Sequence, residues 1–208
     1  METGDRMPRL ITFDGPSASG KKTNNNKLCE HLGIVRRDDC FFSQAMQTLR
    51  MPVLSGRVRP LVWSAVVGAA YKTEWIHKGQ DVFTIVAFWG WIIDYLRWNI
   101  REQSERAEMI DAVDAILSIV SEDIYPICSF YLDISHYDAA QRFINREAKQ
   151  RFHVGIEDIA KPLEEDKQTM EMLNWFADRY PFFHIIDASQ SEEDVFNEVL
   201  THVQSNHL

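Results

Sequence analysis

The sequence is poor in cysteine, and its few cysteines form no recognisable pattern. Cys29, Cys40 and Cys128 are the three cysteines among 208 residues, and no two of them are spaced as Cys-x-x-Cys. An odd number without paired spacing excludes a disulfide scaffold and the usual zinc-binding motifs. We therefore expect a protein of a reducing compartment, and the predicted location is cytoplasmic.

Long hydrophobic runs are also missing. The longest, Val82–Ile93, has about 12 residues and is followed by Asp94, whereas a membrane-spanning helix needs about 20. The polar stretch Met1–Arg9 lacks the apolar core of a signal peptide. The sequence therefore predicts a soluble protein that has no membrane partner.

Basic residues are in the minority. The chain has 22 Lys and Arg against 31 Asp and Glu, which gives a formal net charge of −9. This balance argues against broad electrostatic binding to nucleic acid or to an anionic membrane surface. A small polyanionic ligand is still compatible with it, provided that a few cations are placed locally.

The chain shows no internal repeat, no low-complexity segment and no Gly/Ser/Pro-rich linker, so we predict a single domain over residues 1–208. Short apolar runs alternate with longer helical patterns, which favours an α/β protein with a parallel sheet covered on both faces. The prediction is a three-layer α/β/α fold with five parallel strands, and the ligand site is expected beyond their carboxyl ends. The expected strands are 10–13, 34–35, 82–87, 129–134 and 182–186; the expected helices are 21–32 (closed by Gly33), 41–50, 60–77, 91–120, 136–150, 162–179 and 191–204.

A phosphate-binding motif follows the first expected strand. Residues 15–21 carry the Gly-x-x-x-x-Gly-Lys frame, placed between a strand and a helix as its mechanism requires. The two glycines let backbone N–H groups converge on one anion, and the helix start adds partial positive charge. The motif predicts that the phosphates of ATP bind there, with Lys21 as the catalytic cation. The expected binding residues are Gly15, Ser17, Ala18, Ser19, Gly20, Lys21, Lys22 and Thr23.

One position departs from the usual motif. The residue after the lysine is normally Ser or Thr, whose hydroxyl binds Mg²⁺, but here it is Lys22, and Thr23 follows. We therefore predict Thr23 as a magnesium ligand. Asp14, directly before the loop, is expected to bind a metal-bound water or to position the acceptor phosphate for catalysis. The alternative is that it simply ends the strand in a turn.

The Gly-Lys-x-Thr form, with Gly15-Pro16-Ser17, resembles adenylate and cytidylate kinases. The whole chain is similar to the thymidylate kinase family of nucleoside monophosphate kinases, in the order of its segments. The matching segments are Phe13-Asp14-Gly15, Leu61 to Ala65, Ile76 to Gly79, Pro126 to Asp133, Ala139 to Arg142, and Ile186 to Ala188 with Glu192 to Val195. The resemblance implies a P-loop NTPase fold, ATP and Mg²⁺ as cofactors, nucleotide substrates, a homodimer, and transfer of a phosphoryl group from ATP to dTMP.

The resemblance also implies an acceptor site and a lid. Arg36, Arg37 and Arg59 (or Arg57) are expected to bind the acceptor phosphate, and Trp63 its base. The alternatives are exposed arginines partnered by Asp38 and Asp39, and a tryptophan in the core. Arg142, Arg146 and Arg151, in a lid region around residues 142–160, are expected to stabilise the transferring phosphoryl group. The alternative there is local ion pairing, Asp138 with Arg142 and Glu147 with Arg151.

Two features leave other functions open. The stretch Thr84–Trp89 is uncharged, although the thymidylate kinase family carries an Asp-Arg pair there. The family's middle helix also usually carries an arginine for the acceptor phosphate, whereas Ala65–Gly68 is apolar. The acceptor could therefore be a deoxynucleoside or another small hydroxyl compound. The chain could also be a nucleotide-binding protein that has lost catalysis.

Overall fold

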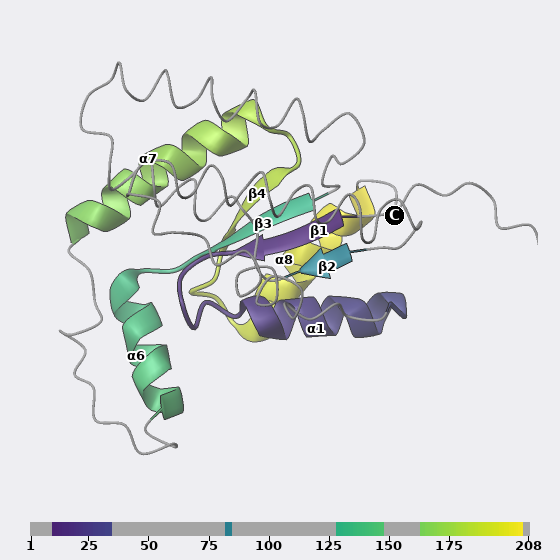
Figure 1. Ribbon diagram of the computed structural model, residues 1–208, viewed down its shortest axis with the longest axis horizontal. Coiled ribbons are helices and arrows are strands. Elements are labelled where there is room, and N and C mark those ends of the chain that lie inside the picture. The colour runs from purple at the N-terminus through teal and green to yellow at the C-terminus, as the bar shows by residue number, and fades with distance from the viewer. Residues whose placement is uncertain (1–9, 35–81, 85–127, 148–162, 206–208) are drawn as a thin grey trace, which may run out of the picture.

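The computed structural model describes residues 10–34, 82–84, 128–147 and 163–205. In these residues the chain is a mixed α/β protein with one parallel sheet (Figure 1). The strands are β1 (Leu10–Asp14), β2 (Val82–Thr84), β3 (Cys128–Asp133) and β4 (Phe183–Asp187). The helices are α1 (Lys21–Leu32), α6 (His136–Glu147), α7 (Leu163–Arg179) and α8 (Glu192–Ser205). The predicted α/β class with parallel strands is confirmed.

The strand order is β2-β1-β3-β4. Strand β1 pairs with β2 on one side and with β3 on the other, with Thr12 opposite both Thr84 and Ser129. Strand β2 thus lies on one side of β1, and β3 and β4 lie on the other. In open parallel sheets such a reversal leaves a crevice at the carboxyl ends of the strands. Helices α1, α6 and α8 all begin at that edge of the sheet (Figure 1).

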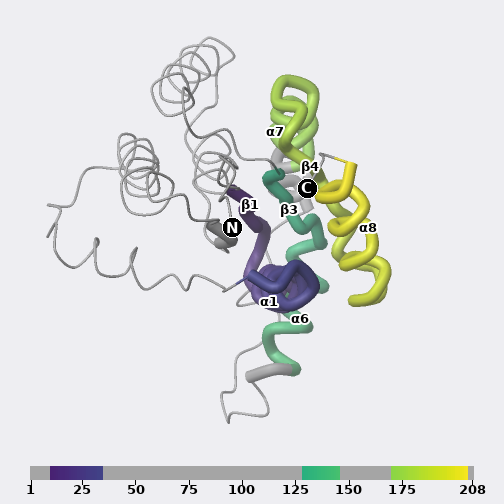
Figure 2. The backbone as a smooth tube through the Cα atoms, turned by 90° about the vertical axis from the view of Figure 1, so that its right-hand side faces the viewer, coloured from purple at the N-terminus to yellow at the C-terminus, as the bar shows by residue number. Residues whose placement is uncertain are grey.

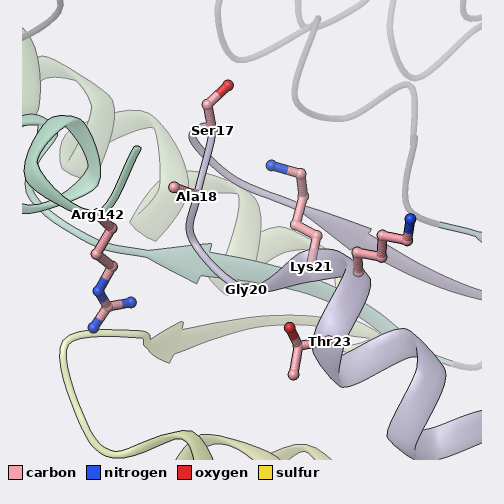
Figure 3. Close-up of a pocket in the computed structure, with 7 residues that line it drawn as sticks. Ser17, Ala18, Gly20, Lys21, Thr23 and Arg142 are labelled. Atoms are coloured by element: carbon pink, nitrogen blue, oxygen red, sulfur yellow. The ribbon is translucent and has the colours of Figure 1, made fainter. Parts of the chain in front are cut away.

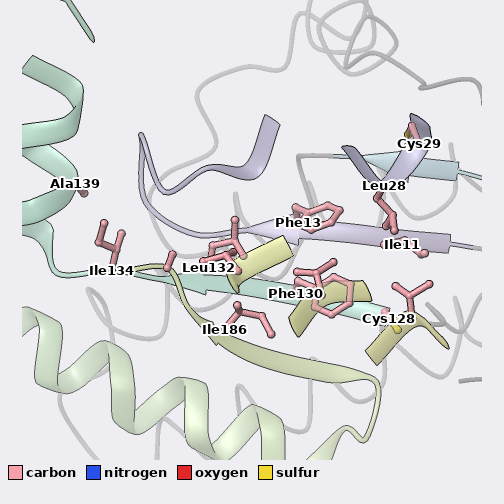
Figure 4. Close-up of a cluster of buried hydrophobic side chains, with 14 residues drawn as sticks. Ile11, Phe13, Leu28, Cys29, Cys128, Phe130, Leu132, Ile134, Ala139 and Ile186 are labelled. Atoms are coloured by element: carbon pink, nitrogen blue, oxygen red, sulfur yellow. The ribbon is translucent and has the colours of Figure 1, made fainter. Parts of the chain in front are cut away.

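One face of the sheet carries the apolar core. Alternate strand residues such as Phe13 and Phe130 point to this face, and helices α1 and α8 cover it with Leu28, Val199 and other side chains (Figure 4). Full burial of a Phe or Leu side chain stabilises the fold by roughly 1.5–3 kcal/mol. The alternation of apolar residues along β1 and β3 therefore explains why α1 and α8 are held against the sheet.

Helix α7 packs against the opposite face. Its Phe176 contacts Phe183 of β4, with 5.7 Å between the ring centroids. Because strand side chains alternate between faces, Phe183 and its neighbour His184 point to opposite sides, and α7 lies across the sheet from α8 (Figure 2). The same face carries the buried hydroxyls of Thr12 and Ser129, which are hydrogen-bonded at 2.6 Å. The described helices therefore cover both faces.

The prediction of five strands is not borne out, because the described residues form four. Ile34, the start of the expected second strand, belongs instead to the motif that ends α1. Gly33 is left-handed (φ 64°), its N–H donates to the carbonyl of Glu30, and the N–H of Ile34 donates to that of Cys29. These are the two hydrogen bonds of a Schellman motif, so Ile34 closes a helix. Val35 lies outside the described residues.

The other expected elements agree to within a few residues where they are described. Helix α1 begins and ends as predicted, and α6, α7 and α8 match the patterns expected at 136–150, 162–179 and 191–204. The helices expected at 41–50, 60–77 and 91–120, and strand residues 85–87, lie outside the described residues. Among the described helices, none has the length and apolar character needed to cross a bilayer.

Candidate functional site

The loop between β1 and α1 has an unusual backbone. Gly15, Ala18 and Gly20 have φ values of 130°, 63° and 98°, and the N–H of Ser19 donates to the carbonyl of Pro16 at 3.3 Å. Left-handed geometry costs a non-glycine residue about 1–3 kcal/mol, so Ala18 is strained. At Gly15, an added Cβ would lie 2.5 Å from the carbonyl oxygen of Leu132. The loop is therefore pressed against β3, and only glycine fits at its first position.

Helix α1 begins directly after this loop, and no side chain among the described residues caps it. Gly20 is its N-cap residue and supplies no side-chain hydrogen bond, and the first turn contains Lys21 and Lys22 but no acidic residue. The first N–H groups of a helix have no intrahelical partner, and the helix dipole places partial positive charge there. Two lysines at this end increase the positive charge, so an anion is the ligand that suits it.

Lys21 is half-buried and folded back onto the loop. Its Nζ donates to the carbonyl oxygens of Gly15, at 2.7 Å, and Pro16, at 2.6 Å. Burial lowers the pKa of Lys21 from its usual 10.5, and the nearby carboxylate of Asp14 opposes that shift. Asp14 itself is the buried last residue of β1. The ammonium of Lys21 is thus held under the loop by carbonyl groups that a bound phosphate could replace.

A cavity of about 440 Å³ opens beside the start of α1. Figure 3 shows the side chain of Arg142 extending from α6 on one side of the cavity, with Gly20 and Thr23 on the other and Lys21 extending from α1 toward the loop. Three cationic side chains from two helices therefore share one cavity, with hydroxyl groups from the loop and from α1. The lining residues are Ser17, Ala18, Gly20, Lys21, Lys22, Thr23 and Arg142.

Arg142 does not form the local ion pair considered from the sequence. In the described part of α6, Asp138 is engaged with Ser135: the Ser135 hydroxyl donates to Asp138 Oδ2 at 2.7 Å and accepts the Asp138 N–H at 3.0 Å. This hydrogen bonding caps α6, and no ion pair joins Asp138 to Arg142. Arg142 is exposed and lines the cavity.

Other predicted residues have different positions. The buried hydroxyl of Ser19 would lie 3.0 Å from a Cβ at Gly15, so it faces the inside of the loop; neither Ser19 nor Asp14 lines the cavity. Arg146 falls within α6. The remaining predicted residues lie outside the described part of the chain: Arg36, Arg37, Arg57, Arg59, Trp63 and Arg151.

Two carboxylates at the same edge of the sheet were not assigned a role from the sequence. Asp133 and Asp187 end β3 and β4 and are paired in register. Burial raises the pKa of Asp133, the charge of Asp187 adds to this effect, and the N–H of Ile134 opposes it. The hydroxyl and N–H of Ser189 donate to Asp187 and lower its pKa. The sequence could have indicated these carboxylates, because the strands β1, β3 and β4 each end on an aspartate.

No protein-family model and no curated protein sequence matches this chain. What the site does must therefore be inferred from its own residues. Among the described residues, no group of three or more His, Cys, Asp or Glu side chains could hold a metal ion.

Proposed function

We propose that the chain is an ATP-dependent kinase of the P-loop type, which transfers the terminal phosphoryl group of ATP to a nucleoside monophosphate, with dTMP as the expected acceptor. The observation that carries the proposal is the start of α1. An uncapped helix with two lysines in its first turn faces a cavity that Arg142 enters from α6. The resemblance to thymidylate kinases supports the choice of acceptor.

The residues around the cavity suit the phosphates of ATP. Lys21 and Lys22 supply ammonium groups, Arg142 supplies a planar fork that can bind two phosphate oxygens, and the first turn of α1 supplies N–H groups. The hydroxyls of Ser17 and Thr23 are further donors. A ligand with several negative charges would find a donor on each side of the cavity. These local cations would offset the repulsion from the net charge of −9 of the whole chain.

Each cationic side chain has a separate task in this proposal. Lys21 would leave the carbonyl groups of Gly15 and Pro16 and hold oxygens of the last two phosphates. Arg142, from a different element, would neutralise the charge that spreads over the phosphoryl oxygens during transfer, as cations do in other kinases. Bound ATP supplies the phosphoryl group itself, so positioning and charge neutralisation are the main contributions of the protein.

Mg²⁺ can be accommodated with few protein ligands. This ion usually keeps several waters and is bound by phosphates together with one or two protein oxygens. Thr23 offers one hydroxyl at the cavity, and Asp14 offers a carboxylate at the end of β1 that could act through water. In this proposal Thr23 and Asp14 are the residues that would hold the ion, whose charge helps to neutralise the phosphates.

The decisive experiment is an assay of ADP formation with ATP, Mg²⁺ and each nucleoside monophosphate in turn. The matched variants are Lys21→Met and Lys27→Met, which remove the same charge from the same helix. Lys27 is ion-paired with Glu192 at 2.5 Å and does not line the cavity. We expect acceptor-dependent turnover in the natural protein and in Lys27→Met, and its loss in Lys21→Met.

The possible outcomes separate the candidate functions. Absence of acceptor-dependent turnover with any nucleoside monophosphate would refute the proposal. Turnover with unphosphorylated nucleosides would identify a nucleoside kinase instead. ATP binding measured by calorimetry, without turnover on any acceptor, would identify a nucleotide-binding protein that does not catalyse transfer.

A further inference from the structure

Asn24 is a buried amide near the start of α1. Its side chain is 2% exposed, and it lies one helical turn before Leu28, which belongs to the apolar core. The buried side of a helix is usually apolar, because an amide there costs free energy unless it is hydrogen-bonded. The next residue, Asn25, is equally enclosed, but its Oδ1 accepts from the thiol of Cys29, one turn further along the helix. The two amides are alike in burial and differ in what they contact.

The amide of Asn24 contacts the phosphate loop. Its Nδ2 donates to the carbonyl oxygen of Gly20 at 3.1 Å, and the backbone N–H of Asn24 donates to the same oxygen at 3.0 Å. The backbone bond is the one that any α-helix supplies. The side-chain bond depends on a short polar residue four positions after the acceptor. The carbonyl of Gly20 is therefore held by two donors from one residue.

This contact fixes the junction between the loop and the helix. Gly20 is the left-handed N-cap residue of α1, with a φ of 98°. Glycine has more backbone freedom than any other residue, so its conformation needs a restraint. The peptide unit from Gly20 to Lys21 is planar and trans, so its C=O and N–H point in opposite directions. Because the carbonyl of Gly20 points toward Asn24, the N–H of Lys21 points back toward the loop.

The N–H of Lys21 is placed to donate to an anion. It is one of the first N–H groups of α1, which have no acceptor within the helix, and both Gly20 and Lys21 line the cavity. The loop has a second restraint, because the ammonium of Lys21 binds the carbonyl groups of Gly15 and Pro16. In the proposed bound state that ammonium leaves them for the phosphates. The bond from Asn24 uses no group that contacts the ligand, so it persists when the ligand binds.

We infer that Asn24 is a positioning residue of this site: its side-chain amide fixes the peptide between Gly20 and Lys21 so that the N–H of Lys21 donates to a phosphate group. The inference rests on the proposed function, because it takes the phosphates of ATP as the ligand of the cavity. Asn24 contacts neither the ligand nor the reacting atoms and acts through the backbone. An apolar side chain of similar size would fill the same space but would leave this peptide with one restraint fewer.

The test compares two side chains of the same shape at residue 24. In Asn24→Thr we expect the hydroxyl to donate to the carbonyl of Gly20, as the hydroxyl of Thr201 donates to the carbonyl of Asn197 in α8, at 2.8 Å. In Asn24→Val a methyl group replaces this donor. Asn25→Val is the matched control, because it removes an equally buried amide that is bonded to Cys29 instead of the loop.

The full chain and each variant are titrated by calorimetry with ATP in excess Mg²⁺ and with inorganic tripolyphosphate, and thermal unfolding is measured in parallel. We expect Asn24→Val to bind both ligands about tenfold more weakly than the natural protein, which is the scale of one hydrogen bond to a charged group. Asn24→Thr should regain most of this loss, and Asn25→Val should bind like the natural protein. A merely structural role would instead make the affinity follow the unfolding temperature in all three variants.

Two results would overturn the inference and leave the proposed function intact. One is unchanged affinity in a folded Asn24→Val; the other is an equal loss of affinity in Asn24→Val and in either Asn24→Thr or Asn25→Val. Absence of ATP binding by the natural protein would refute the proposed function, and the inference with it. If Asn24→Val does not fold, Asn24→Ala, which also lacks the donor and has a higher helix propensity, is compared with Asn24→Ser in its place.

Discussion

Helices α1 and α8 both begin after a strand at the same edge of the sheet, but their first turns are built differently. At α8, the hydroxyl of Ser191 donates to the carboxylate of Asp194 at 2.6 Å and accepts its N–H at 3.2 Å. The first turn also carries Glu192 and Glu193, which complement the helix dipole. At α1, Gly20 provides no side-chain cap, and the first turn carries two lysines.

The difference separates a helix start that is capped by nearby side chains from one at which the N-cap residue supplies no side-chain hydrogen bond. The protein satisfies the start of α8 from its own side chains, and α6 is capped in the same way by Ser135 and Asp138. In the part of the chain that the structure describes, the start of α1 has no such side-chain cap, and its lysines oppose the dipole. A site that lacks stabilisation in the free protein can gain it from an anionic ligand, which is why we place the function at α1.

The largest expected effect is on ligand binding at α1. Lys21→Met should weaken ATP binding by about 100-fold or more, because a charge-assisted contact to phosphate is lost. Ser191→Ala, at the start of α8, should leave the affinity unchanged. Calorimetric titration of both variants checks this expectation. Comparable losses in the two would contradict the distinction between the helix starts.

The second prediction concerns the packing of α8 at low pH. His184 on β4 and His202 on α8 are stacked, with ring centroids 4.1 Å apart. Burial and the neighbouring His202 lower the pKa of His184 from 6.5 to about 4. Because the unfolded chain binds this proton more readily, stability should fall as the pH decreases from 6.5 toward about 4.

The expected loss is on the order of 1–2 kcal/mol, reduced because the pair is partly exposed. Urea unfolding at several pH values measures it. In His184→Phe the acid dependence should become shallower, since that titrating group is gone while an aromatic ring remains beside Phe130. An unchanged slope in this variant would show that other groups control acid stability.

Removing the cap of α8 should have a moderate effect on stability. Ser191→Ala should lower the free energy of unfolding by about 1 kcal/mol, because two hydrogen bonds at the helix start are lost. Ser205→Ala, at the last residue of the same helix, is the control. Denaturant unfolding of both variants provides the comparison, and equal losses would mean that the capping geometry is unimportant.

The smallest expected effect comes from making the start of α1 resemble that of α8. Lys22→Glu should raise the free energy of unfolding of the ligand-free protein by about 0.5 kcal/mol, through the helix dipole. The gain should shrink as salt is added, because the side chain is exposed. The same variant should bind ATP less well. A loss of stability at low salt would argue against the electrostatic explanation.

Local features of the fold were predictable because their signals lie within a few residues. The bounds of α1 and the left-handed Gly33 that ends it follow from a helical pattern closed by glycine. The strand expected at 34–35 is not seen at Ile34 for the complementary reason: a short apolar pair next to a helix end can serve a capping motif as well as a strand.

Side-chain partners were less predictable, because several local rules compete for one residue. The spacing of Asp138 and Arg142 offered an ion pair as the alternative to the expected phosphate role of Arg142, but Asp138 caps α6 through Ser135. Arg142 is thereby left to face the cavity. The composition of the loop indicated phosphate binding, and the resemblance to a known family named three arginines, of which the structure brings Arg142 to the cavity.

The sequence by itself determined the loop and the helix after it, since glycine placement, the position of Lys21 and the helical pattern are properties of one short segment. Only the tertiary structure decided that β1 lies between β2 and β3, and that α6 brings Arg142 to the same cavity as Lys21 and Lys22. The physical reason is that strand pairing and helix packing depend on apolar surfaces contributed by segments far apart in the chain. No local pattern specifies which of these surfaces meet.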